Sequence, residues 1–224
     1  MEGAPDLREE REQVAAASRR LAAEGLVLGT AGNVSARRDD LVAITPTGAA
    51  LATLAADEVT VVGLADGQVV DGTLAPTSEL DLHLGVYRRY GAGAVVHTHS
   101  PGATALSCVV GDELPCVHYA MLILGGSVPV APYATFGTPE LAESVLGVLE
   151  GKTAALMANH GAINFGGSID AAVEGALLLE WACDVYTRAL GAGEPRALSA
   201  EQQQDVMRAA VERSYGTKKT LEDG

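Results

Sequence analysis

The apolar positions of the chain follow two patterns, one typical of helices and one typical of strands. From Glu10 to Leu28 they recur every three to four residues, which predicts a helix, and Gly25 offers a stop signal. Two short β-prone pieces follow, VSAR and LVAIT, and the RDD between them is a hairpin signal. A second pair of β-prone pieces surrounds the turn ADGQ. The first third of the chain is therefore predicted to hold a helix and two hairpins.

The rest of the chain mixes both patterns. A helix is predicted to begin at Thr77 or Ser78, because acidic residues follow in its first turn, and GAVVHTH is typical of a short buried strand. The remaining predicted elements are a helix in GATALSCVV, a strand in VPVAPYA, a helix in TPELAESVLGVLE, strands in AALMANHGAINFG and a long helix that Ser168 caps. The pattern predicts an α/β fold, a single-domain α/β/α sandwich around a central mainly antiparallel or mixed sheet.

Composition and charge narrow the class of protein. A chain of 224 residues that is 48% hydrophobic suits one globular domain. Residues 1–190 are expected to form it, and residues 191–224 to form a C-terminal helix and tail that pack on it or on a neighbouring subunit. The formal net charge of −14 argues against nucleic acid as a partner. No apolar run is long enough to span a membrane and no leader-like apolar region occurs, so we expect a cytoplasmic protein without a membrane partner.

Two histidines stand at the end of the strand predicted in GAVVHTH. Residues two apart in a strand share a face, so His97 and His99 would present their imidazoles side by side. A catalytic zinc ion needs about three protein ligands and an open position, and His160 with Glu79 are the best further candidates. An isolated pair of this kind also occurs as a surface or structural feature, and the residues alone leave both interpretations open.

The other polar motifs are weaker on their own. His118 could be a fourth ligand, but we favour a supporting role, and His83 is interpreted as a packing residue among leucines. The loops GTAGNVS, TPTG and PTSE offer amide and hydroxyl donors to an anion, although ordinary turns have the same composition. None of these features decides the function.

The order of the motifs along the chain is more specific than any one of them. GNVS, ITPTG, PTSE, HTH, HYAM, APYATFGT and NHG follow one another between residues 29 and 161. This succession resembles the class II, zinc-dependent aldolase/epimerase family, and VHYAMLILGG with VPVAPYATFGTPEL is similar to its fuculose phosphate aldolase branch. The resemblance implies that residues 1–190 form a class II aldolase domain.

The resemblance also implies roles for individual residues. His97, His99 and His160 match the metal ligands, and Glu79 matches an acid/base residue that touches the resting metal, which is zinc or another divalent ion. Tyr119 matches a tyrosine that acts as proton donor from an adjacent subunit. The residues that match the phosphate loops are Gly32, Asn33, Thr47, Gly48, Thr77 and Ser78, Phe136 matches a residue of the aldehyde pocket, and Tyr215 matches a tail tyrosine that helps to close the site.

The activity implied by this branch is that of a lyase. It would cleave a ketose 1-phosphate, L-fuculose 1-phosphate or a 5-deoxypentulose 1-phosphate, to dihydroxyacetone phosphate and a small aldehyde through an enediolate, in a homotetramer with interfacial active sites. The epimerase branch places an aspartate where this chain reads VHYAML, so an L-ribulose-5-phosphate 4-epimerase is the weaker alternative. A decarboxylase, a dehydratase or a non-catalytic interaction domain on the same fold stay open.

Overall fold

The computed structural model describes residues 7–213, and the sequence candidate Tyr215 lies outside them. The strands are β1 Asn33–Arg38, β2 Leu41–Ile44, β3 Thr60–Gly63, β4 Val69–Asp71, β5 Ala94–Thr98, β6 Glu113–Leu114, β7 Val128–Ala131, β8 Ala154–Met157 and β9 Gly161–Gly166. The α-helices are α1 Arg8–Ala23, α2 Leu80–Tyr90, α3 Pro101–Ser107, α4 Pro139–Val148, α5 Ile169–Ala192 and α6 Ala200–Glu212, and three short 3₁₀-helices are η1 Leu51–Thr53, η2 Ala56–Glu58 and η3 Tyr119–Leu124.

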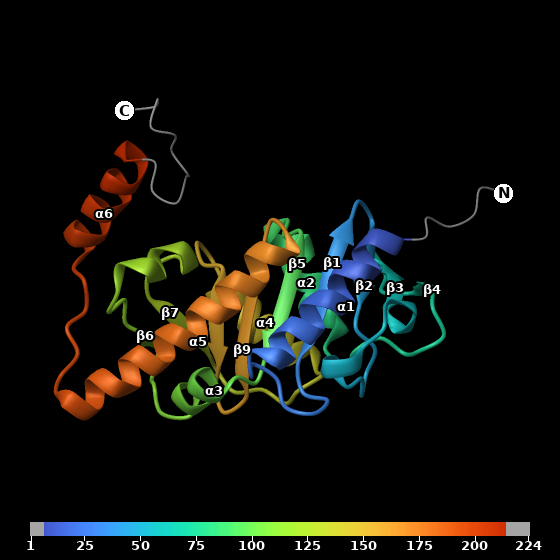
Figure 1. Cartoon of the computed structure of the whole chain (residues 1–224), viewed down its shortest axis with the longest axis horizontal. Helices are drawn as coiled ribbons and strands as arrows, with labels where there is room; N and C mark the ends of the chain where they lie inside the picture. Colours follow the sequence, from blue (N-terminus) through green and yellow to red (C-terminus); the bar gives the residue numbers. More distant parts are fainter. Residues whose placement is uncertain (1–6, 214–224) are drawn as a thin grey trace.

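The strands form one sheet in the order β4-β3-β2-β1-β5-β9-β8-β7-β6 (Figure 1). Neighbouring strands are antiparallel except β7 and β8, which are parallel. Helices α1, α3 and α5 pack on one face of the sheet, while α2 and α4 pack against each other on the opposite face. The predicted α/β/α sandwich around a mainly antiparallel sheet is therefore confirmed.

The centre of the sheet is buried on both faces. All five residues of β5 are buried; Val96 packs in the core beneath α1, and Val95 packs in the core beneath α2 and α4. A strand covered on both sides has no solvent-facing positions, which explains why GAVVHTH lacks polar alternation before its histidines. Burial on both faces makes β5 a rigid support for whatever its end presents.

Two helix boundaries can be compared with the sequence prediction. The first helix ends at Ala23, just before the stop signal predicted at Gly25, because Gly25 adopts a positive φ of 78° and Leu26 folds back into the core. Helix α2 begins at Leu80, with Glu79 at its N-cap position, because the Thr77 hydroxyl accepts a hydrogen bond from the Glu79 backbone N–H instead of capping a longer helix. The early hairpin forms as predicted, and Asp39 at its turn has a φ of 54°.

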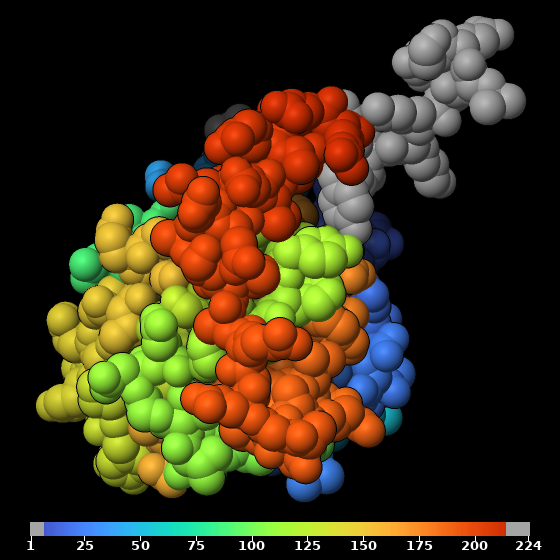
Figure 2. Space-filling model, turned by 90° about the vertical axis from the view of Figure 1, so that its left-hand side faces the viewer, coloured from blue at the N-terminus to red at the C-terminus, as the bar shows by residue number. Residues whose placement is uncertain are grey.

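Helix α6 stands away from the sandwich at one end of the molecule (Figures 1 and 2). It has no buried residue, and its side chains Met207 and Val211 are exposed. Of the rest of the molecule, α6 packs chiefly against η3, which the sequence did not predict. No helix within residues 7–213 combines the length and apolar character of a membrane span.

Candidate metal centre

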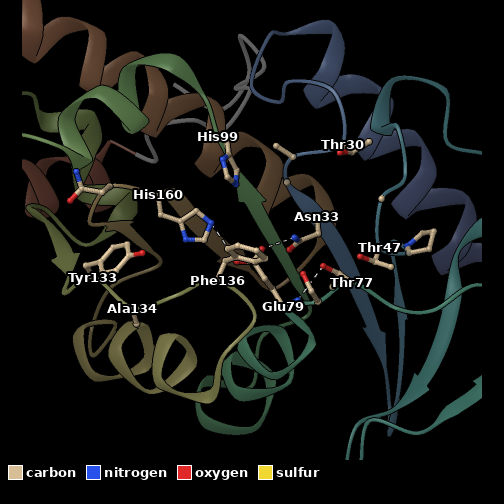
Figure 3. Close-up of a pocket in the computed structure, with 16 residues that line it drawn as sticks. Thr30, Asn33, Thr47, Thr77, Glu79, His99, Tyr133, Ala134, Phe136 and His160 are labelled. Carbon is tan, nitrogen blue, oxygen red and sulfur yellow. Dashed lines mark hydrogen bonds and ion pairs between the residues drawn. The ribbon is translucent and has the colours of Figure 1, made fainter.

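Three segments that are distant in sequence meet at one end of the central strands. β1 runs antiparallel to β5, so its first residue, Asn33, is the register partner of His97 near the end of β5. The turn between β8 and β9 carries His160 to the same end, because β9 pairs antiparallel with β5 on its other side. Glu79, at the start of α2, completes the group, and Figure 3 shows it between His160 and Asn33.

The three histidines form a compact set of nitrogen donors. One ring nitrogen from each of His97, His99 and His160 lies within 4.8 Å of the others. His97 Nδ1 lies 2.9 Å from the backbone carbonyl of Ala162, so Nδ1–H donates to it, and Nε2 faces the cluster. The structure therefore brings together the three histidines that were predicted as metal ligands, because the segments that carry them end side by side in the sheet.

Ring nitrogens and carboxylate oxygens face one another at short distances in this cluster. His97 Nε2 lies 2.9 Å from His99 Nε2 and 3.2 Å from Glu79 Oε2. Glu79 Oε1 is buried, accepts no hydrogen bond among the described residues and lies 3.5 Å from His160 Nε2. Imidazole nitrogens and carboxylate oxygens that converge on one point are the ligand atoms that divalent metal ions take in proteins. The donor set therefore fits a divalent cation, and three imidazoles with a carboxylate suit zinc.

The surroundings hold these groups in the protonation states that metal binding needs. Burial, with a smaller effect of the neighbouring His97, lowers the pKa of His99 and of His160 to about 4. Both imidazoles are neutral at pH 7 and keep a lone pair. Burial raises the pKa of the Glu79 carboxyl, but His97 and the hydrogen bond from Asn33 oppose this effect, so its pKa lies below the usual value. Glu79 is thus a carboxylate.

The cluster opens into a pocket of about 350 Å³. Two of the predicted phosphate loops line this pocket (Figure 3). One holds Thr47 and Gly48 after β2, and the other holds Thr77 and Ser78 before α2. The backbone joins these two loops, with the Thr47 N–H donating to the Ala75 carbonyl and the Thr77 N–H donating to the Thr45 carbonyl. No Lys or Arg is among the described residues that line the pocket. An anion there would be held by neutral donors.

Gly32 and Asn33 also line the pocket, at the start of β1. A side chain at position 32 would meet the His97 carbonyl, because an ideal Cβ there lies 2.9 Å from that oxygen. The Asn33 side chain is only 6% exposed, and its Nδ2 donates to Glu79 Oε2 at 2.8 Å. This amide therefore serves the carboxylate, a role that the loop motif GNVS did not indicate.

The outer wall of the pocket includes residues that the sequence interpretation missed. Phe136, a residue that the sequence predicted, lines this wall. Tyr133, Thr30 and Asn159 line the pocket as well and were not predicted. Tyr133 and Phe136 are each 67% exposed, so their rings stand at the entrance. Tyr133 belongs to the quoted motif APYATFGT, which could have revealed it. Asn159 has a φ of 55°, a conformation that asparagine tolerates, and it precedes His160 directly in the turn.

Tyr119 lies outside this pocket. It is 44% exposed at the start of η3, and its ring lies 4.4 Å from that of His118, centroid to centroid. Tyr119 lines an apolar hollow beside α6 with Ile123 and Met207, and the His118 ring also lies against Trp181 of α5. His118 is not part of the histidine cluster, and its Nδ1 accepts a hydrogen bond from the Ala120 N–H. The supporting role expected for His118 therefore lies at η3.

The fold and a histidine cluster that could hold a metal ion agree with the class II aldolases, and comparison with known proteins shows the same class. Residues 12–187 match the family model for the class II aldolase and adducin N-terminal domain, so the chain belongs to this family. It is 37% identical over 203 residues to the 5-deoxy-D-ribulose 1-phosphate aldolase of Bacillus thuringiensis serovar kurstaki, covering 89% of this chain and 94% of that one.

Other relatives belong to the fuculose phosphate branch. The chain is 36% identical over 181 residues to the L-fuculose phosphate aldolase of Escherichia coli K12, covering 80% of this chain and 83% of that one. A solved structure of L-fuculose 1-phosphate aldolase superimposes with a TM-score of 0.86 at 31% identity, covering 92% of this chain and 97% of that one. The resemblance noted in the motifs is confirmed over most of the chain.

Proposed function

We propose that this chain is a divalent-metal-dependent aldolase that reversibly cleaves a ketose 1-phosphate to dihydroxyacetone phosphate and a small aldehyde. The observation that carries the proposal is the cluster of three histidines with a buried carboxylate at the base of a pocket lined by the loops predicted to bind an anion. The names of the relatives support L-fuculose 1-phosphate or a 5-deoxypentulose 1-phosphate as substrate. Charged sugar phosphates are retained inside cells, so the proposed location is the cytoplasm.

His97, His99 and His160 would hold the ion, with zinc as the proposed metal. Such an ion supplies Lewis-acid stabilisation of negative charge that develops on substrate oxygens beside it. Cleavage between C3 and C4 leaves an electron pair on C3, and a positive charge nearby lowers the cost of that step. The described chain offers no lysine for a Schiff base in the pocket, since Lys152 donates to the Gly125 and Ser127 carbonyls instead.

Glu79 is the proposed acid/base group. It is ionised and 6% exposed, and one oxygen is fixed by Asn33 while the other has no donor among the described residues. Its free oxygen would take the proton from C3 of dihydroxyacetone phosphate in the synthetic direction and return it in cleavage. The hydroxyls of Thr47, Ser78 and Thr77 would donate to the phosphate, together with the backbone at Gly32 and Gly48.

A second subunit would complete the site. The proposed proton donor Tyr119 lies outside the pocket of its own chain, on the surface beside α6. Apolar side chains exposed on that surface include Ile123, Met207 and Val211. An assembly that buries them would bring Tyr119 toward the pocket of a neighbour, with residues 191–224 packed between subunits. We therefore propose a homotetramer with interfacial sites, in which Tyr119 protonates the aldehyde oxygen, Phe136 contacts the aldehyde and Tyr215 helps to close the site.

The test combines metal content with cleavage of L-fuculose 1-phosphate and 5-deoxyribulose 1-phosphate, with release of dihydroxyacetone phosphate as the readout. Wild type should bind about one zinc per chain and release the product only when loaded. Glu79→Gln should keep the metal and lose proton exchange at C3, His97→Ala should lose the metal, and His118→Ala should keep it. A loaded wild type that releases no dihydroxyacetone phosphate from either substrate would reject the aldolase in favour of an epimerase, decarboxylase or dehydratase.

A further inference from the structure

A buried chain of hydrogen bonds leads from the core to the proposed acid/base group. The Tyr87 hydroxyl lies 2.6 Å from Ser35 Oγ, which lies 2.7 Å from His83 Nδ1. His83 Nε2 lies 2.5 Å from Asn33 Oδ1, and Asn33 Nδ2 donates to Glu79 Oε2 at 2.8 Å. Every one of these side chains is buried, and His83 and Ser35 have no exposed surface at all. The packing role that the sequence suggested for His83 does not account for these bonds.

The direction of each bond follows from the carboxylate at the end. Ionised Glu79 can only accept, so Asn33 must present its NH₂ group to it and its Oδ1 to His83. Because Oδ1 can only accept, His83 donates from Nε2–H. Complete burial favours the neutral imidazole, so His83 Nδ1 accepts from the Ser35 hydroxyl. Ser35 then accepts from the Tyr87 hydroxyl. All the donors point toward Glu79.

We propose that His83 is a positioning residue that locks the Asn33 amide in the one orientation that donates to Glu79. If the amide rotated by half a turn, its Oδ1 would face the carboxylate and repel it. The Nε2–H of His83 makes that rotation unfavourable, since it would then meet the NH₂ group. The catalytic effect of His83 rests on the proposed function, because it acts only through Glu79.

The placement of His83 on α2 supports this role. Glu79 stands at the N-cap of α2 and His83 lies four residues later, one helical turn away on the same side. Asn33 lies at the start of β1, and its side-chain amide is hydrogen-bonded to both Glu79 and His83 of the helix. The network thus ties the start of α2 to the strand beside His97, and a side chain that only filled space at position 83 would leave Asn33 free to turn.

The experiment compares two amide substitutions in the full-length, metal-loaded protein. In His83→Gln the longer side chain brings an NH₂ donor close to the position of Nε2, whereas in His83→Asn the amide reaches only the position of Nδ1. Tyr90→Phe is the control on α2, the helix of His83, because it removes a 2.6 Å hydrogen bond from the Tyr90 hydroxyl to the Leu146 carbonyl of α4 without touching the network. The measurements are kcat, KM, metal content and Tm, with the ¹⁵N shifts of labelled histidines in wild type.

The proposal expects kcat to fall about 10- to 100-fold in His83→Asn at little change in KM or metal content. His83→Gln should recover most of that loss, and Tyr90→Phe should keep kcat while lowering Tm. The ¹⁵N shifts should show His83 as the Nε2–H tautomer. Equal kcat in the two His83 variants, or an Nδ1–H tautomer, would overturn the proposal. A wild type without aldolase activity would instead reject the proposed function, and the tautomer would then decide on the positioning role.

Discussion

Gly32 offers a direct test of how the start of β1 supports the metal centre. Its φ is 91°, and an ideal Cβ would lie 2.9 Å from the His97 carbonyl oxygen and 2.9 Å from Val27 Cγ1. Gly29, three residues earlier, has a φ of 63° and open space around the position of a Cβ. Gly32→Ala and Gly29→Ala therefore share a backbone cost, but only the first places a methyl group against the strand that carries His97.

The expected magnitudes follow from these two terms. A left-handed conformation costs a non-glycine residue about 1–2 kcal/mol, which is the whole expected loss for Gly29→Ala. Overpacking against a buried backbone atom adds about 1–3 kcal/mol for Gly32→Ala. For a chain of this size the difference between the two variants corresponds to a Tm lower by roughly 2–12 °C.

The assay is thermal unfolding of both variants at equal protein and metal concentration, followed by metal content after dialysis. Gly32→Ala should unfold at the lower temperature and retain less metal, since the clash displaces the His97 backbone. Gly29→Ala should retain metal as wild type does. If the two variants had the same Tm and metal content, the close approach of residue 32 to β5 would not be a feature of the protein in solution.

Two further predictions concern the lysine and the metal. Lys152→Met should lose about 1–3 kcal/mol of stability, because Nζ donates to the Gly125 and Ser127 carbonyls at 2.8 Å. Its kcat should stay that of wild type. A variant that folds but has no activity would argue for Schiff-base chemistry. Removal of the metal with a chelator should lower Tm by about 5–10 °C relative to protein at 100-fold the metal's Kd, and added zinc should restore it. His97→Ala should show no such shift, and an equal shift in that variant would place the stabilising metal elsewhere.

The central strands and the gathering of the three histidines could be predicted from the sequence because both depend on local pattern. A run of buried residues ending in His97 and His99 predicts a strand whose end presents two imidazoles, and the structure has this arrangement. His160 follows another apolar run. It lies close to His97 and His99 if the strand beside it is the neighbour of β5 in the sheet. The antiparallel pairing of β5 and β9 satisfies that condition.

The role of His83 and Asn33 could not be predicted in this way. Their hydrogen bond joins residues 50 positions apart, and its existence depends on how α2 packs against β1. The same holds for η3 and α6, whose apolar side chains give no local sign of what covers them. Sequence periodicity predicts which face of an element is apolar, whereas the partner of a buried polar atom is decided by tertiary packing.

Among the described residues, no lysine or arginine lines the pocket, and this has a consequence for how a substrate arrives. The protein carries a formal net charge of −14, and a sugar phosphate is itself an anion, so the long-range field opposes their approach. Within the pocket, attraction would come from the proposed metal ion and, at hydrogen-bond range, from the threonine hydroxyls and backbone amides of the lining loops. Salt screens the repulsion over about 8 Å at physiological ionic strength. Moderate salt should therefore assist the encounter, the reverse of its effect on enzymes that steer anions with basic residues.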